Sequence, residues 1–226
     1  KMSREQRVVV DYIRSGSNVV VDACAGSGKS TTILSVAKEL SGKRILQFTY
    51  NSMLRHEIKE KVRELKLKNM EVHTYHSFAV KYYSDMAHTD TGIRHMLRDN
   101  KCPRRTLEMV DLVVLDEAQD MTPLYFELIV KMSKDMCSKD NTNNKKGDHK
   151  FQLLVLGDYM QGLYEFKGAD IRFLTKADII WNELPFLENN VFKPCVLKTS
   201  YRVTNQMAEF VNKDMLGDDR LLACRE

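Results

Sequence analysis

The sequence lacks the features that mark membrane-spanning, secreted and zinc-binding proteins. No apolar run among its 226 residues approaches the ~20 that would span a bilayer. Its five cysteines are odd in number and widely scattered, which favours reduced thiols inside a cell over a disulfide framework. His73 and His76 have no third metal ligand nearby. We therefore expect an intracellular protein without a membrane partner, in the nucleus or the cytoplasm, a viral source included.

A signal peptide and internal repeats are also absent from the sequence. Its first residues have neither a charged segment followed by an apolar one nor a cleavage site. A chain whose first residue is Lys1 is expected to be part of a longer one. The composition is 43% hydrophobic and 29% charged, typical of an ordinary folded protein. At this length the chain can form one large α/β domain, or one domain plus part of another.

The net charge of +4 is modest, but its distribution is uneven. One short segment, residues 93–105, carries five basic residues against the single acid Asp99. Arg94, Arg98 and Lys101 are expected to share one helix face until Pro103 interrupts it. This face is either a contact for a phosphate backbone or an ordinary solvated surface.

Strand and helix patterns alternate along the chain. Short apolar runs predict strands at residues 19–21, 44–49, 71–74, 112–116, 151–157 and 195–199. Helical spacing of apolar residues predicts helices at 32–40, 54–65, 77–83, 123–136 and 204–215. This alternation is typical of an α/β fold with a parallel, doubly wound sheet. Residues 139–150 are polar and without periodicity, and we expect a flexible loop there.

A phosphate-binding loop is predicted between the first strand and the first of these helices, in the run Ala-Cys-Ala-Gly-Ser-Gly-Lys-Ser-Thr. Glycines let backbone N–H groups wrap around phosphate oxygens, while Lys29 adds a full charge and the Ser30 hydroxyl can bind Mg²⁺. The alternative is a Gly/Ser helix cap. The predicted nucleotide-binding residues of the loop are Ala25, Gly26, Ser27, Gly28, Lys29, Ser30 and Thr31.

Two adjacent acids follow the strand at 112–116, where ligands of open α/β sheets gather. Asp116 can hold Mg²⁺ through its water shell. Glu117 is placed to orient and deprotonate the water that attacks a γ-phosphate. Acids at this position also serve as helix caps, which is the structural alternative.

Seven motifs in a fixed order give the chain a resemblance to the superfamily 1 DNA helicases of the UvrD/Rep type. They are Gln6, the phosphate loop, Phe48-Thr49-Tyr50-Asn51, Val72 to Phe78, Asp116 to Asp120, Gly157 to Ala169, and Ser200-Tyr201-Arg202. The resemblance implies a RecA-like P-loop NTPase fold that uses ATP and Mg²⁺. It further implies that Gln6 reads adenine, Tyr201 stacks on it, and Gln161 and Arg202 reach the γ-phosphate alongside Lys29, Asp116 and Glu117.

The same resemblance implies a path for single-stranded DNA, with DNA junctions as a further partner. Aromatic side chains stack on bases of any sequence, which suits such a path; without the motif order they would be assigned to the core. Either Phe48 or Tyr50 is the DNA-contacting aromatic of its motif, because the alignment of this motif can shift by one residue. The implied DNA contacts are Thr49, Tyr50, Asn51, Thr74, His76, Tyr164 and Phe166, and the basic segment adds Arg94 and Arg98.

Two departures from the family pattern, and one difference from other groups of the superfamily, refine the expectation. Phe166-Lys167 replaces an aromatic-arginine pair, which keeps the charge but loses the guanidinium fork. Only 32 residues, 79–110, separate two motifs between which bacterial members insert a large subdomain, so the F-box DNA helicase branch and its viral relatives are more similar. The Pif1/RecD and Upf1 groups carry Leu-Pro-Pro after the glutamine equivalent to Gln161, and this chain does not. The UvrD-like branch is therefore favoured.

The expected domains are a first RecA-like ATPase domain at 1–78 and 111–215, a short helical insertion at 79–110, and the start of a connection at 216–226. Only 24 residues follow Arg202, too few for a second RecA-like domain. We expect an N-terminal motor domain of an ATP-dependent, 3′ to 5′ DNA helicase used in repair or recombination, itself weak in ATP binding and hydrolysis. The alternatives are a nucleotide-gated DNA-binding module without motor activity and a small-molecule kinase.

Overall fold

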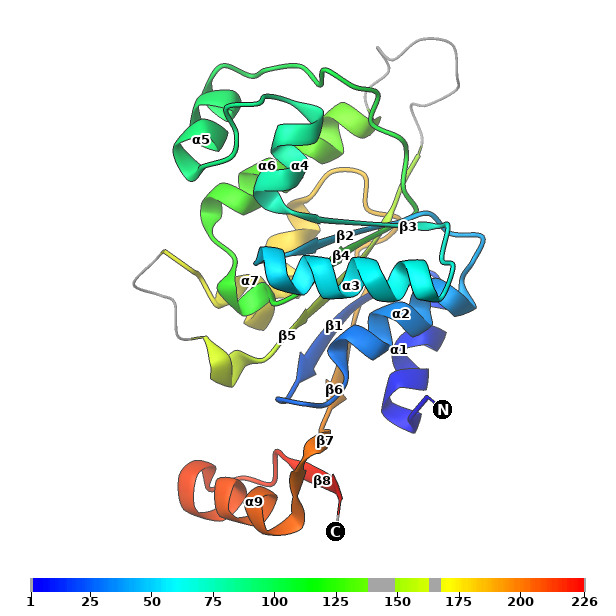
Figure 1. Ribbon diagram of the computed structural model, residues 1–226, viewed down its shortest axis with the longest axis vertical. Coiled ribbons are helices and arrows are strands. Elements are labelled where there is room, and N and C mark those ends of the chain that lie inside the picture. The colour runs from blue at the N-terminus through cyan, green and yellow to red at the C-terminus, as the bar shows by residue number, and fades with distance from the viewer. Residues whose placement is uncertain (1, 138–148, 163–167, 226) are drawn as a thin grey trace.

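A computed structural model describes residues 2–137, 149–162 and 168–225 (Figure 1). Six parallel strands form the central sheet in the order β3-β2-β4-β5-β1-β6. Their bounds are β1 Asn18–Ala23, β2 Ile45–Thr49, β3 Met70–Thr74, β4 Leu112–Leu115, β5 Gln152–Gly157 and β6 Phe192–Leu197. The predicted parallel sheet flanked by helices is confirmed.

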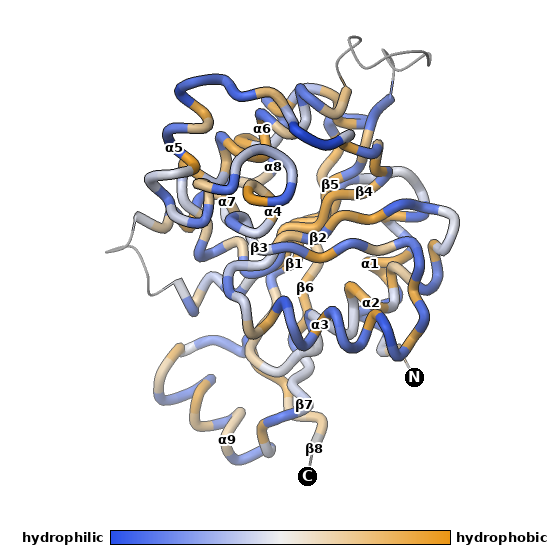
Figure 2. Tube along the Cα trace, turned by 45° about the horizontal axis from the view of Figure 1, so that its top comes forward, coloured by the Kyte–Doolittle hydropathy of each residue, from blue (hydrophilic) through white to orange (hydrophobic). Residues whose placement is uncertain are grey.

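Helices cover both faces of this sheet. One layer holds α1 Arg4–Arg14, α2 Lys29–Glu39 and α3 Ser52–Glu64. The other holds α4 Tyr75–Tyr82, α5 Asp90–Arg98, α6 Pro123–Cys137, α7 Arg172–Thr175 and α8 Ala177–Ile180. Successive residues of a strand point to opposite faces, so Leu112 and Val114 join the first layer's core while Val113 and Leu115 join the second. Figure 2 shows these hydrophobic strands between the two helical layers.

Short 3₁₀ helices follow three of the main elements. They are η1 Ala118–Asp120 after β4, η3 Tyr159–Gln161 after β5, and η5 Trp181–Glu183 after α8. The first two extend from the carboxyl ends of their strands, the edge at which the candidate site lies. No helix in the described ranges is long and apolar enough to cross a membrane.

The segment 79–110 packs into the same core as the second helical layer. Ile93 and Met96 of α5 are buried together with Leu107 and Val110 in the cluster that includes α6. The sequence predicted that Arg94, Arg98 and Lys101 share one helix face. This prediction is wrong for Lys101, which lies beyond the end of the helix. The helix α5 ends at Arg98, and Asn100 adopts a left-handed φ of 43° that a continuing α-helix does not allow.

Residues 199–225 form a second, smaller unit below the main sheet in Figure 1. It consists of β7 Thr199–Thr204, α9 Asn205–Phe210, a π-helix Val211–Leu216 and β8 Leu222–Arg225, with β7 and β8 paired in parallel. The predicted strand at 195–199 is wrong in its bounds, because β6 begins at Phe192 and ends at Leu197. Pro194 is tolerated there because β6 is the edge strand, where a missing N–H breaks no internal ladder.

Candidate nucleotide site

The phosphate loop connects β1 to α2 and depends on two glycines in the left-handed region. Gly26 has φ 75° and Gly28, the N-cap of α2, has φ 88°. The loop is closed by a hydrogen bond of 3.1 Å from the Ser27 N–H to the Cys24 carbonyl. The Ser27 hydroxyl is buried without a partner among the described residues. The loop therefore places an unpaired polar group and a helix N-terminus where an anion is stabilised.

Residues 200–202 lie against this loop, although they are far from it in sequence. The Tyr201 N–H donates to the Gly26 carbonyl at 3.0 Å, and the Ser200 hydroxyl donates to the Ala25 carbonyl at 2.9 Å. A Cβ atom at Gly26 would lie 2.7 Å from Ser200 Oγ and 2.9 Å from Arg202 Cγ. Tyr201 is 38% exposed beside the loop. The structure thus brings the last predicted motif to the phosphate loop that precedes α2.

Gln6 reaches the same loop from α1. Its side-chain amide donates to the Gly28 carbonyl at 3.5 Å, while its carbonyl accepts from the Ser3 N–H at 3.0 Å. The residue is 3% exposed and completes the capping box at the start of α1. Gln6 therefore ties α1 to the phosphate loop, and its adenine-reading role stays a prediction.

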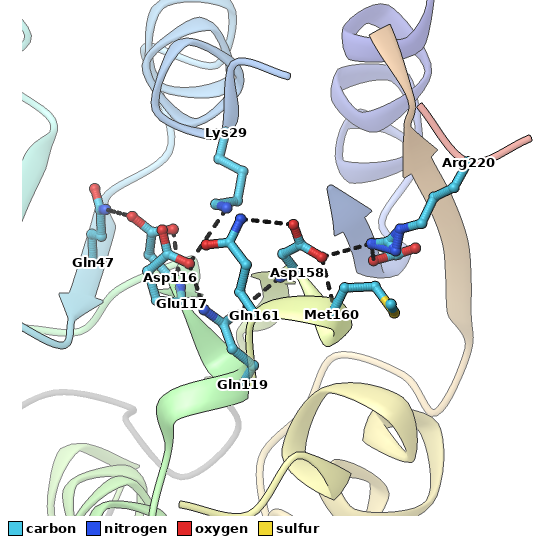
Figure 3. A network of polar contacts seen from close by, with 10 residues as sticks. Lys29, Gln47, Asp116, Glu117, Gln119, Asp158, Met160, Gln161 and Arg220 are labelled. Carbon is cyan, nitrogen blue, oxygen red and sulfur yellow. Dashed lines mark hydrogen bonds and ion pairs between the residues drawn. The ribbon is translucent and has the colours of Figure 1, made fainter. Parts of the chain in front are cut away.

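Lys29 and Glu117 meet at the centre of the site. The Lys29 Nζ lies 3.4 Å from Glu117 Oε2, and both side chains are largely shielded from solvent. Glu117 also accepts a hydrogen bond of 2.8 Å from the Gln119 side-chain amide. Its backbone has a left-handed φ of 54°, which a glutamate rarely adopts and which turns the side chain toward Lys29 (Figure 3).

Asp116 lies at the end of β4 and is 1% exposed. Its carboxylate accepts from the Gln47 amide at 3.1 Å and from the Glu117 N–H at 3.0 Å. Burial, and then the charge of Glu117, raise the pKa of Asp116 to about 7, against the opposing charge of Lys29. Burial and Glu117 likewise raise the pKa of Asp120 to about 6, and its Oδ1 is buried without a partner in the described structure.

These acids fit a divalent cation that is shared with a phosphate. Two crowded, desolvated carboxyl groups are stabilised when a cation neutralises them. Within the described ranges, no set of three or more His, Cys, Asp and Glu side chains could hold a metal by itself. Mg²⁺ is usually bound by one or two carboxylates together with water and substrate phosphates. Asp116 with the Ser30 hydroxyl matches that pattern.

Asp158 organises the neighbouring part of the site after β5. It accepts from the Gln161 side-chain amide at 2.8 Å and from Arg220 Nη2 at 2.7 Å, and its own N–H donates to Gln119 Oε1 at 3.1 Å. Figure 3 shows Lys29, Glu117, Gln161 and Asp158 directed into one region at the carboxyl edge of the sheet. Sequence reasoning assigned no role to four contributors, Gln47, Gln119, Asp158 and Arg220.

Three of the residues predicted to contact DNA have structural roles in the fold. Thr49 is fully buried at the end of β2. Asn51 caps α3 by accepting from the Leu54 N–H at 2.8 Å, and Thr74 caps α4 by accepting from the Ser77 N–H at 3.1 Å. Such caps stabilise helices by about 1 kcal/mol, so the presence of Asn51 and Thr74 is explained without a ligand.

The other described DNA candidates cluster around α4, α5 and α6. His76 Nε2 lies 2.9 Å from Asp90 Oδ1, which also accepts from the Tyr125 hydroxyl at 3.1 Å. Tyr50 meets the Tyr125 ring edge-on, with centroids 6.5 Å apart. Arg94 and Arg98 are exposed on α5, and Arg98 Nε lies 3.0 Å from Asp99. The two remaining candidates, Tyr164 and Phe166, lie outside the described residues.

Comparison with known proteins defines the family of the chain. The family described as AAA domain matches residues 6–167, and the chain belongs to it. Among curated proteins, none matches the sequence.

Solved structures with the same fold include three Pif1 helicase structures. The Candida albicans Pif1 helicase superposes with a TM-score of 0.56 at 18% identity, over 94% of this chain and 44% of that one. Two coordinating Pif1 helicases that unwind forked double-stranded DNA give 0.54 at 17%, over 95% and 48%. Bacteroides sp. Pif1 in complex with ADP-AlF4 gives 0.51 at 17%, over 95% and 46%. The chain therefore spans less than half the length of these proteins and shares their RecA-like P-loop fold.

Proposed function

We propose that this chain is the ATP-binding motor domain of a superfamily 1 DNA helicase. The observation that carries the proposal is the meeting of Lys29, at the start of α2, with Glu117, after β4, at 3.4 Å. Nucleotide hydrolysis needs a cation at a phosphate-binding helix terminus, which Lys29 supplies, and a carboxylate close to it, which Glu117 supplies. The ADP-AlF4 bound to the similar Bacteroides protein supports a nucleotide as the ligand.

Each residue has a distinct task in this proposal. The loop N–H groups around Gly26 and Gly28 bind phosphate oxygens, and Lys29 neutralises the outer phosphates. Asp116 and Ser30 would hold Mg²⁺, which supplies charge neutralisation on the phosphate oxygens when bound. Glu117 accepts a proton from the attacking water once the nucleotide draws Lys29 away from it.

Two further side chains complete the nucleotide contacts. Gln161 donates to the γ-phosphate from η3, and Arg202 stabilises the charge of its transfer from beside the loop. Tyr201, exposed next to Gly26, stacks on the adenine that Gln6 borders. These assignments agree with the motif order and with the contacts of residues 200–202 on the phosphate loop.

Single-stranded DNA is the proposed second ligand. Pif1 of Bacteroides is described as bound to ssDNA, and its structure superposes on this chain with a TM-score of 0.50. Tyr50, His76, Arg94 and Arg98 would contribute aromatic and cationic contacts. The motif order adds Asn51, Thr74, Tyr164 and Phe166, while Thr49, whose side chain is buried, would support this path from beneath. The UvrD-like branch and 3′ to 5′ polarity rest on the motif sequence alone. The connection expected at 216–226 contains β8 and the buried Arg220, and a second RecA-like domain would follow it.

Nucleotide titration with fluorescent ATP and ADP analogues tests the central assignment. Lys29→Ala should weaken ATP binding about 10- to 100-fold, as expected for a lost charge-assisted contact. Lys38→Ala is the matched control, because Lys38 is exposed near the other end of α2. Equal affinities in the two variants would disprove the phosphate-loop assignment.

Hydrolysis separates the motor from its alternative, a nucleotide-gated DNA-binding module. In the full-length protein, Glu117→Gln should preserve ATP binding and reduce phosphate release about 10²- to 10⁴-fold, because only the proton acceptor is lost. A wild-type protein that binds ATP and single-stranded DNA but releases no phosphate would favour the module.

A further inference from the structure

Arg220 is a buried cation that connects the C-terminal unit to the carboxyl edge of the main sheet. Its side chain is 7% exposed, and its Nη2 donates to Asp22 Oδ1 at 2.8 Å and to Asp158 Oδ1 at 2.7 Å. The guanidinium also lies over the Tyr159 ring, 3.9 Å from its centroid. One side chain thus links the ends of β1 and β5 to the segment between the π-helix and β8.

The backbone around Arg220 is fixed by its neighbours. The Asn212 side chain pairs with both polar groups of the Leu221 backbone, donating to its carbonyl at 2.8 Å and accepting from its N–H at 3.0 Å. Asn212 is itself buried in the π-helix. The position of Arg220 therefore depends on the folded C-terminal unit.

Asp158 divides its two oxygens between Arg220 and Gln161. Oδ1 accepts from Arg220 and from the Met160 N–H at 3.1 Å, and Oδ2 accepts from the Gln161 amide at 2.8 Å (Figure 3). The Asp158 side chain is only 5% exposed, so without Arg220 it would be a buried anion with no ion-pair partner in the described part of the chain. Such an anion would draw water toward itself or change its rotamer. Either change would break its hydrogen bond with the Gln161 amide.

We propose that Arg220 is a positioning residue for recognition of the γ-phosphate. It holds Asp158, and through Asp158 it holds Gln161 in the orientation that distinguishes ATP from ADP. This inference rests on the proposed nucleotide function. It adds that Arg220, which is not itself a nucleotide contact, sets the preference for ATP.

The test compares fluorescent ATP and ADP analogues on the same variants. Arg220→Met should weaken ATP binding about tenfold, the cost of one charge-assisted hydrogen bond, and leave ADP binding within twofold. Arg220→Lys should recover part of the preference, because a lysine keeps the charge but not the planar guanidinium that lies over the Tyr159 ring. Arg172→Met is the matched control. Arg172 also pairs with an aspartate, with its Nη2 2.7 Å from Asp170 Oδ2, but its side chain is exposed.

A double-mutant cycle distinguishes positioning from a general loss of structure. If Arg220 acts through Gln161, adding Arg220→Met to Gln161→Ala should weaken ATP binding no further than Gln161→Ala alone. If Arg220→Met does not fold, as judged by circular dichroism, Arg220→Lys takes its place in the cycle.

Three outcomes would overturn the inference. They are an unchanged ATP-to-ADP ratio in Arg220→Met, an equal loss of both nucleotides, and additive losses in the double mutant. A wild-type protein that binds neither nucleotide would overturn the proposed function and this inference with it. A wild-type protein that prefers ATP, with an unchanged ratio in Arg220→Met, would overturn this inference alone.

Discussion

Gly26→Ala is the change that most directly tests how residues 200–202 pack on the phosphate loop. Two separate costs arise at this position. Gly26 has a left-handed φ of 75°, which costs an alanine about 1–2 kcal/mol. The new Cβ would also lie 2.7 Å from Ser200 Oγ and 2.9 Å from Arg202 Cγ. Displacing those atoms costs a further ~1–3 kcal/mol, as in other overpacked sites.

Two other glycines separate these costs. Gly217 has a φ of 65° and Gly42 does not have a positive φ, and an added Cβ at either meets nothing within 4 Å. All three alanines restrict the unfolded chain equally, so that contribution cancels between variants. Gly42→Ala should be neutral or raise stability by about 0.5 kcal/mol. The free energy of unfolding of Gly217→Ala should be about 1 kcal/mol below that of Gly42→Ala. That of Gly26→Ala should be another ~1–3 kcal/mol lower.

Thermal unfolding followed by circular dichroism measures the series. For a chain of this size, 1 kcal/mol corresponds to about 2–4 °C in Tm, so Gly26→Ala should melt roughly 4–16 °C below Gly42→Ala. Nucleotide titration should show weakened binding in Gly26→Ala alone. Equal Tm values for Gly26→Ala and Gly217→Ala would refute the packing of residues 200–202 on the loop.

Two more predictions concern stability away from the nucleotide. Burial raises the pKa of Glu71, but hydrogen bonds from His73 and Lys81 outweigh it and lower the pKa to about 2. A depressed acid stabilises the fold above its unfolded pKa of about 4.5 and loses that contribution as the pH falls toward 2. The Glu71 side chain is 41% exposed, so Glu71→Gln should lower the free energy of unfolding in urea by only about 1 kcal/mol at pH 7 and by almost nothing near pH 2. Glu57→Gln, at an exposed position, is the control and should not change the free energy of unfolding at either pH. Trp181 is fully buried and donates to the Phe173 carbonyl at 2.9 Å, so Trp181→Phe should lower the free energy of unfolding by about 2 kcal/mol; a loss below about 0.5 kcal/mol would contradict this packing.

The sequence predicted the central strands because they are buried on both faces. β4 and residues 153–156 of β5 are continuous apolar runs, a pattern typical of the middle of a parallel sheet. The edge strand β6 exposes Lys193 and Pro194, so its apolar signal was confined to its last residues and its predicted bounds were shifted. The predicted helix 204–215 likewise changes from α9 to a π-helix, which no apolar spacing distinguishes.

The candidate site was predictable where function and local sequence coincide. Lys29 and Glu117 belong to motifs, and the structure brings them together. Thr74 was assigned to DNA, although Thr-x-x-Ser at a helix start was also readable as a capping box. Arg220 has no local signal, because its partners Asp158 and Asp22 are 62 and 198 positions away and only the folded chain brings them together.

Residues 199–225 attach to the nucleotide site at two places, and the two attachments differ in chemistry. Ser200 and Tyr201 contact the phosphate loop through neutral hydrogen bonds to main-chain carbonyls. Arg220 contacts the opposite part of the site through a buried ion pair with Asp158. A rigid displacement of this unit therefore changes the loop that binds any nucleotide and the glutamine that would sense the γ-phosphate at the same time. Gly26→Ala disturbs the first attachment and Arg220→Met the second, so general nucleotide affinity and the preference for ATP should be separable by mutation.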